Sequence, residues 1–269
     1  MSGADPSVGL REALIAALAR LDALGLNRGS TGNLSVRDGE GMWITPTGMG
    51  AGETGADDLV WLGWDGTLRG RWKPSSEWHF HRAIYRARPE LGAVVHAHAV
   101  NATALACLER GLPPFHYMVA LAGGDSVPCV RYRRFGTEAL SREVAAAMRT
   151  RDACLLAHHG LVAAGATLAR AMKLALEVES LCEVYLKALA VAEPPRLSAR
   201  RMAEVIESFR HYGQPAGATA TPLSAARAPA RSRAASPRAR ARRPARAPAR
   251  TARRGRARPP APRRAAASP

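Results

Sequence analysis

The sequence changes character at residue 214, and this change limits the part of the chain that can fold. From there to residue 269 the chain holds 15 Arg and ten Pro, but no Lys, no acidic residue and no aromatic residue. Such a segment cannot bury enough apolar surface to offset the entropy that folding would cost. We therefore predict a folded domain over residues 1–213 and a disordered Ala/Arg/Pro-rich basic tail over residues 214–269.

The positive charge of the chain is concentrated in this tail. Of the 39 Lys and Arg residues, 15 lie there, so the first 213 residues carry 24 basic against 22 acidic residues. An Arg-rich tail attracts nucleic acids and other polyanions without regard to their sequence. Polyanion binding is therefore one candidate function, although the tail has no aromatic side chains to stack on bases. Its GC-rich codons leave a shifted reading frame as a second explanation.

Cysteine spacing and hydropathy indicate the compartment. Four widely spaced cysteines, with no C-x-x-C pair, are typical of a reduced protein. The first residues lack the basic start and apolar run of a secretory signal, and no stretch approaches the ~18 consecutive apolar residues of a membrane span. We expect a cytoplasmic protein.

The periodicity of the first 213 residues predicts intermixed helices and strands, and hence an α/β protein. Apolar residues at helical spacing predict helices at 10–24, 77–86, 137–148 and 168–189. Ser75 and Ser76 are the expected N-cap candidates of the second helix. Short apolar runs predict strands at 93–99 and 153–156. The polar segments 27–35 and 45–48 are expected to be loops beside strands.

His96 and His98 are the first candidates for metal binding. Side chains alternate along a strand, so both imidazoles of His96-Ala97-His98 are expected on one face. Two polar residues on a solvated strand face have the same spacing, so the pair alone does not define a metal site. A third ligand is required.

His158-His159-Gly160 follows an apolar run, where a strand gives way to a loop. Taken alone, this pair is better explained as two loop histidines. Together with His96 and His98, however, it supplies the third imidazole of a site in which a catalytic zinc keeps an open position.

Three polar segments are candidates for phosphate binding. Ser75-Ser76-Glu77 offers hydroxyls and free N–H groups at a helix start, where partial positive charge favours an anion, but it is also an ordinary helix cap. Residues 29–33 and Thr47-Gly48 are either phosphate-binding loops or simple turns. The residues alone leave both interpretations open.

Taken together and in this order, these segments resemble the class II aldolase/adducin family. The resemblance covers about residues 8–213 and is carried by NRGSTGNLS (27–35), ITPTG (44–48), PSSE (74–77), VVHAHA (94–99), HYM (116–118), GG (123–124), FGT (135–137) and HHG (158–160). The family implies a three-layer α-β-α sandwich around a central, mostly antiparallel sheet. It also implies a homotetramer with its sites at subunit interfaces.

The resemblance implies a role for each site residue. His96, His98 and His159 would ligate one Zn²⁺ per subunit, and Glu77 would be the general acid/base that can also approach the metal. Tyr117 of a neighbouring subunit would act on the aldehyde end and Tyr212 would cover the site, while His158 is not expected to be a ligand. The residues implied to hold the substrate phosphate are Gly32, Asn33, Thr47, Gly48, Ser75 and Ser76.

The implied reaction is the reversible aldol cleavage of L-fuculose 1-phosphate, or a close ketose 1-phosphate, to dihydroxyacetone phosphate and L-lactaldehyde, as part of fucose metabolism. Zinc would stabilise the enediolate and Glu77 would move the proton beside the carbonyl. Pentulose-phosphate 4-epimerases and a methylthioribulose-1-phosphate dehydratase are the alternatives within the family. The epimerases typically carry Asp after the two serines, where this chain has Glu77. Adducin-like members lack the metal ligands, so the three histidines favour an enzyme.

Overall fold

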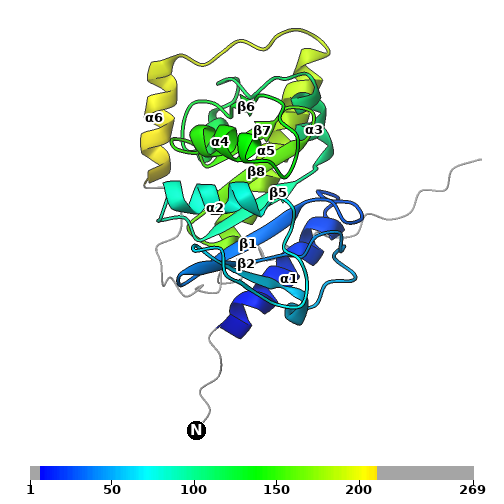
Figure 1. The fold of residues 1–269 in the computed structure, drawn as a ribbon. Coiled ribbons are helices and arrows are strands. Elements are labelled where there is room, and N and C mark those ends of the chain that lie inside the picture. Colours follow the sequence, from blue (N-terminus) through cyan, green and yellow to red (C-terminus); the bar gives the residue numbers. More distant parts are fainter. Residues whose placement is uncertain (1–6, 211–269) are drawn as a thin grey trace, which may run out of the picture. The chain divides into compact units, whose positions relative to one another are not determined.

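The computed structural model describes residues 7–210, in which an eight-stranded sheet lies between two layers of helices (Figure 1). The strand order is β4-β3-β2-β1-β5-β8-β7-β6. Every neighbouring pair is antiparallel except β6 and β7, which are parallel. The predicted α/β sandwich with a mostly antiparallel sheet is confirmed. Tyr212 and the tail lie outside the described residues, so the predictions made for them, and the domain boundary, stay predictions.

The elements follow one another with strands and helices intermixed. The strands are β1 (Asn33–Asp38), β2 (Gly41–Ile44), β3 (Val60–Gly63), β4 (Leu68–Arg69), β5 (Ala93–Ala97), β6 (Cys129–Val130), β7 (Ala153–Leu156) and β8 (Gly160–Gly165). The helices are α1 (Ser7–Ala23), α2 (Trp78–Ala87), α3 (Val100–Cys107), α4 (Glu138–Ala147), α5 (Leu168–Leu189) and α6 (Ala199–Arg210), with short 3₁₀ segments η1 (Ala56–Asp58) and η2 (Tyr117–Ala122).

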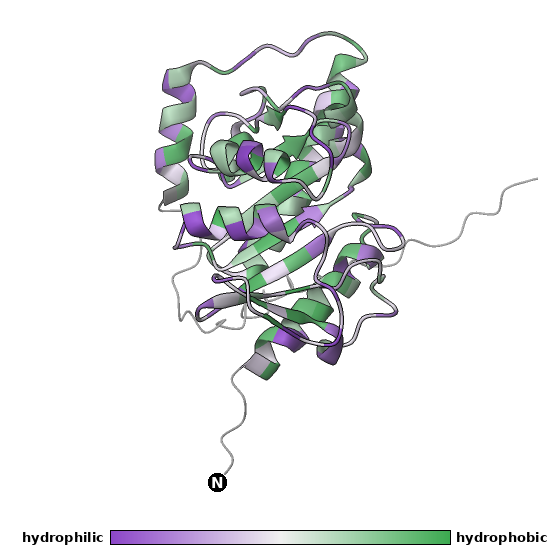
Figure 2. Ribbon diagram, viewed as in Figure 1, coloured by the Kyte–Doolittle hydropathy of each residue, from purple (hydrophilic) through white to green (hydrophobic). Residues whose placement is uncertain are grey.

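Side chains of the central strands alternate between two apolar cores. Val95 of β5 belongs to the core that contains Leu14 of α1 and Val178 of α5. Its neighbour Val94 belongs to the other core, with Val144 of α4. Successive side chains of a strand point to opposite faces, so a sheet covered by helices on both sides needs apolar residues at consecutive positions. Figure 2 accordingly shows the strands coloured mostly as hydrophobic and the helices with hydrophilic bands.

Most predicted elements are found close to their predicted positions. Helix α5 and strand β7 have the predicted limits. Helix α4 begins after Thr137, whose hydroxyl accepts a hydrogen bond from the Leu140 N–H. The structure adds α3 and α6, which the apolar patterns do not predict.

Three local predictions are wrong. The strand predicted over 93–99 ends at Ala97, so His98 lies beyond it. The predicted loop over 27–35 is a strand from Asn33 onward, because β1 pairs with both β2 and β5. Neither Ser75 nor Ser76 is the N-cap of α2, since Glu77 occupies that position and its side chain makes no capping hydrogen bond.

One end of the central sheet brings distant segments together. Strand β1 starts where β5 ends, with Asn33 opposite His96, and β8 starts opposite the end of β5, with Leu161 opposite Ala97. The loops that precede β1 and β8 and the segment that follows β5 therefore meet at the same end of these central strands.

Candidate metal centre and cavity

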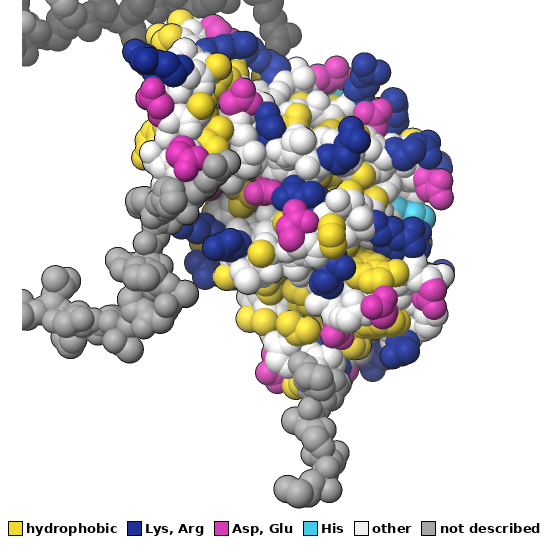
Figure 3. Space-filling view, turned by 90° about the vertical axis from the view of Figure 1, so that its left-hand side faces the viewer, with side chains coloured by type: hydrophobic (Ala, Val, Ile, Leu, Met, Phe, Trp, Pro, Cys, Tyr) yellow, Lys and Arg dark blue, Asp and Glu magenta, His cyan; other side chains and the backbone are white. Residues whose placement is uncertain are grey.

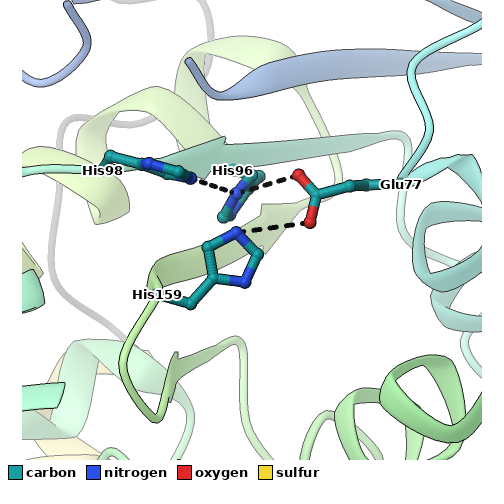
Figure 4. Close-up of side chains that lie close together, drawn as sticks. All are labelled: Glu77, His96, His98 and His159. Carbon is teal, nitrogen blue, oxygen red and sulfur yellow. Dashed lines mark hydrogen bonds and ion pairs between the residues drawn. The ribbon is translucent and has the colours of Figure 1, made fainter. Parts of the chain in front are cut away.

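Four side chains converge at this end of the central strands, as Figure 4 shows. His96 comes from β5, His98 from the short segment after it, His159 from the turn before β8, and Glu77 from the N-cap of α2. Nε2 of His96 lies 3.1 Å from Nε2 of His98 and 3.1 Å from Oε2 of Glu77. Nε2 of His159 lies 3.3 Å from Oε1 of Glu77. The structure thus brings together the four residues that the sequence suggested as metal ligands.

The protonation of His96 is set by its backbone partner. Nδ1 of His96 lies 2.8 Å from the carbonyl oxygen of Leu161, which can only accept a hydrogen bond. In the neutral ring Nδ1 therefore carries the proton, and Nε2 presents a lone pair to the centre. This lone pair faces the carboxylate oxygen of Glu77, and two lone pairs repel unless a cation or a proton lies between them. Burial disfavours the charged ring, but Glu77 raises the pKa of His96, so a proton fills this place when no metal ion is bound.

Burial and neighbouring charges set the ionisation of the other groups. Burial disfavours the carboxylate form of Glu77, but His96 and His159 outweigh it and hold the pKa of Glu77 below its usual value. Burial, with the charge of His96, lowers the pKa of His98 to about 4 and that of His159 to about 3. An anionic carboxylate and neutral imidazoles are the forms that bind a metal ion, so a bound metal ion would replace the proton on His96.

The donor set fits zinc. Three imidazoles and a carboxylate are common zinc ligands, and neighbouring ligand atoms of a tetrahedral site with ~2.0–2.1 Å bonds lie roughly 3.3 Å apart. Three pairs of ligand atoms in this cluster, His96 with His98, His96 with Glu77 and His159 with Glu77, lie 3.1–3.3 Å apart. All four ligand atoms lie within 4.8 Å of one another. In addition, Oε1 of Glu77 is buried and has no hydrogen-bond partner.

A cavity of about 310 Å³ opens beside this cluster. Its lining includes Glu77, His98 and His159. It also includes all six residues implied to bind phosphate, namely Gly32, Asn33, Thr47, Gly48, Ser75 and Ser76. Their role as phosphate ligands stays a prediction, but their position next to the metal ligands is the one that it requires.

Gly32 is required by its surroundings. Its φ is +71°, which disfavours other residues, and a Cβ there would lie 2.3 Å from the Asn27 amide nitrogen. The Asn27 side chain in turn accepts a hydrogen bond of 3.0 Å from the His98 N–H. The segment that carries His98 is therefore held against the loop that lines the cavity.

The Asn33 side chain has a contact that the sequence did not predict. Its Nδ2 donates to Oε2 of Glu77 over 2.9 Å, and its Oδ1 lies 2.6 Å from Nε2 of His81. The amide thus orients the carboxylate, whatever else Asn33 contributes to the cavity.

Two other predicted residues lie apart from the metal ligands. Tyr117 is 49% exposed, stacks on Phe209 of α6, and does not line the cavity of its own chain. Its action on a neighbouring subunit stays a prediction. His158 lines the cavity but turns its Nε2 toward Glu109, 3.1 Å away, and is not part of the cluster.

Another part of the cavity wall consists of residues for which the sequence predicts no role. Tyr132, Arg133 and Phe135 line it, and the two aromatic rings are 57% and 63% exposed. Arg133 also pairs with Glu143 over 2.9 Å. Only Phe135 belonged to a segment that carried the resemblance, since exposed residues in a loop have no pattern that distinguishes them.

Fold and site together define a metal-binding α/β protein with a polar cavity beside the metal ligands. Residues 12–186 match the family model of the Class II Aldolase and Adducin N-terminal domain. The chain belongs to the class II aldolase and adducin family, and the resemblance noted in the sequence is confirmed.

Named relatives and a solved structure point to the aldolases within this family. The chain is 52% identical over 206 residues to a 5-methylthioribulose-1-phosphate/5-deoxyribulose-1-phosphate aldolase of Rhodospirillum rubrum, covering 77% of this chain and 93% of that protein. It is 46% identical over 205 residues to the L-fuculose phosphate aldolase of Escherichia coli, covering 76% and 95%. A solved L-fuculose 1-phosphate aldolase is similar with a TM-score of 0.73 and 37% identity, covering 77% of this chain and 98% of that chain.

Within residues 7–210, no helix is both long and apolar enough to span a bilayer.

Proposed function

We propose that this protein catalyses the reversible, zinc-dependent aldol cleavage of a ketose 1-phosphate to dihydroxyacetone phosphate and an aldehyde. The observation that carries the proposal is that one cavity is lined both by three members of the cluster, Glu77, His98 and His159, and by the polar loops at Gly32, Thr47 and Ser75. A substrate phosphate held by these loops would place the adjacent carbonyl beside the cluster.

Zinc and Glu77 have separate tasks in this proposal. Held by the three histidines, the metal would supply Lewis-acid stabilisation of the negative charge that develops on the substrate when the carbon–carbon bond breaks. Glu77 is ionised and buried, and its Oε1 has no hydrogen-bond partner. This oxygen is therefore available to exchange the proton at the carbon beside the carbonyl.

The phosphate end depends on hydroxyl and backbone donors. Ser75 and Ser76 immediately precede Glu77, the N-cap of α2, and the glycines of the other two loops leave room for close approach to backbone N–H groups.

The aldehyde end favours an apolar terminus. The exposed rings of Tyr132 and Phe135 form part of the wall, and each CH₂ group buried against such rings contributes about 0.8 kcal/mol. We therefore favour substrates that end in a methyl or thioether group: L-fuculose 1-phosphate, 5-deoxyribulose 1-phosphate and 5-methylthioribulose 1-phosphate. Relatives of this chain are named for these substrates.

Assembly and location complete the proposal. We expect a homotetramer in which Tyr117 of a neighbouring subunit completes the aldehyde end. All four cysteines are free, which agrees with a reduced, cytoplasmic location.

A substrate panel tests the reaction. Purified zinc-loaded protein is incubated with the three ketose 1-phosphates and with pentulose 5-phosphates, and cleavage, epimerisation and dehydration products are measured separately. Release of dihydroxyacetone phosphate from a ketose 1-phosphate is expected. Epimerised pentulose phosphate or a dehydrated product without cleavage would assign the protein to the alternative branches.

The Arg-rich tail favours a second, separate activity, polyanion binding. On the face shown in Figure 3, the basic and acidic side chains of residues 7–210 are interspersed, so this face has no broad positive patch. DNA binding that depends steeply on salt and disappears when residues 214–269 are deleted would assign this activity to the tail alone. Binding that survives the deletion would contradict that assignment.

A further inference from the structure

A chain of buried polar side chains leads from Glu77 away from the cavity. Asn33 and Ser35 belong to β1, and His81 and Tyr85 belong to α2. Their exposed fractions are 4%, 0%, 0% and 1%. Burying so many polar groups costs free energy unless each one is paired, so their arrangement needs a physical reason.

The chemistry of the groups fixes the direction of each hydrogen bond. The carboxylate of Glu77 only accepts, so the Asn33 Nδ2 faces it and the Asn33 Oδ1 faces His81. This oxygen also only accepts, so Nε2 of His81 carries the ring proton. Nδ1 of His81 then accepts from the Ser35 hydroxyl, 2.7 Å away.

Tyr85 closes the far end of the chain. Its hydroxyl donates to the Ser35 carbonyl over 3.0 Å and lies 2.9 Å from the Ser35 Oγ. Burial, with the charge of nearby His96, lowers the pKa of His81 to about 3, so the ring is neutral and carries a single proton. A neutral ring with one fixed proton can orient the Asn33 amide in only one way.

This orientation makes the two oxygens of Glu77 different. Oε2 accepts the hydrogen bond from Asn33 and faces His96. Oε1 is buried without a hydrogen-bond partner and lies 3.3 Å from His159. Oε2 is therefore anchored by a hydrogen bond, while the lone pairs of Oε1 stay free to take up a proton.

We propose that His81 is a positioning residue which, through Asn33, anchors Oε2 of Glu77 so that Oε1 is the oxygen that exchanges the substrate proton. This inference rests on the proposed aldol cleavage and adds a role for a residue that touches neither substrate nor metal. If His81 only stabilised the fold, any polar replacement of the ring would lower stability and activity together.

Two replacements of similar size separate these roles. A glutamine amide nitrogen reaches about as far as the Nε2 of histidine, whereas an asparagine amide lies near the place of Nδ1. His81→Gln therefore keeps the donor to Asn33, and His81→Asn loses it while keeping a partner for Ser35. Both variants exchange the same ring for an amide.

The two variants are compared with the wild type in kcat, KM, zinc content and thermal midpoint. We expect His81→Asn to lower kcat by about 10–100-fold, the usual effect of losing such a supporting partner, with KM and zinc content unchanged. We expect His81→Gln to keep kcat near the wild-type value, although the thermal midpoints of both variants fall. Equal loss of kcat in both variants, or loss of zinc instead of kcat, would overturn the proposal.

The tautomer of His81 gives a measurement that does not depend on activity. In protein labelled with [¹⁵N]histidine, the His81 signals are identified by their absence from His81→Gln. We expect a protonated Nε2 and an unprotonated Nδ1, with or without zinc. Protonation at Nδ1 would refute the positioning role. If the tautomer is as expected but wild-type protein cleaves no ketose phosphate, the proposed function fails and the hydrogen-bond chain stands.

Discussion

Nε2 of His96 lies 3.1 Å from Oε2 of Glu77, and the lone pairs of these two atoms repel unless a proton or a metal ion lies between them. The contact joins the end of β5 to the start of α2, and both side chains are buried. A metal ion shared with His98 and His159 removes the repulsion and explains why a carboxylate is buried beside three imidazoles.

Zinc binding is expected to stabilise the folded protein. A ligand that binds only the folded state adds about 2.7 kcal/mol when its concentration is 100 times its Kd. Calorimetry should show a midpoint that rises with added zinc, and His159→Ala should reduce this rise. His158→Ala is the matched control, because His158 lies beside the cluster without joining it. Loss of the zinc response in His158→Ala would contradict the ligand assignment.

Glu77→Gln is expected to slow cleavage by about 10²–10⁴-fold, the range typical of general acid–base groups. The replacement keeps the size of the side chain but removes the basic oxygen. Circular dichroism should show a folded protein. If the variant keeps near-wild-type turnover, Glu77 does not move the proton.

Gly32→Ala is expected to destabilise the protein and weaken zinc binding. The left-handed conformation alone costs about 1–2 kcal/mol for a residue with a Cβ. The added carbon would also displace Asn27, which holds the His98 backbone. Urea denaturation and zinc titration measure the two effects.

Gly29→Ala is the matched control for this change. Gly29 has a φ of +63°, but a Cβ there meets no atom within 4 Å. Gly29→Ala should therefore show the conformational cost without the loss of zinc affinity. Equal zinc affinity in both variants would show that the close packing of Asn27 against Gly32 does not position His98.

Mixed subunits test the role of Tyr117. In one chain Tyr117 does not line the cavity of Glu77, so we expect it to act in a neighbour. Glu77→Gln and Tyr117→Phe, each nearly inactive, should recover activity when unfolded and refolded together, because some sites then have both wild-type residues. The absence of recovery would place Tyr117 outside a shared site.

Segments held by apolar packing were predicted more accurately from the sequence than segments held by buried hydrogen bonds. Helix α5 and strand β7 were predicted with their limits, because continuous apolar patterns determine them. The start of β1 was missed, because Asn33 and Ser35 are buried through hydrogen bonds rather than through apolar contacts.

The same contrast holds for the site. His96, His98 and His159 were found from their order and spacing, and the structure confirms that they converge. His81 was missed because in the sequence it is one polar residue of a helix, and its partner Ser35 lies 46 residues away. No local pattern reports such a pairing.

A zinc titration of metal-free protein with a ketose 1-phosphate tests the central claim most directly. We predict that dihydroxyacetone phosphate is released in proportion to added zinc, and that the rate saturates when each subunit holds one ion. Full cleavage activity in the metal-free protein would contradict the claim.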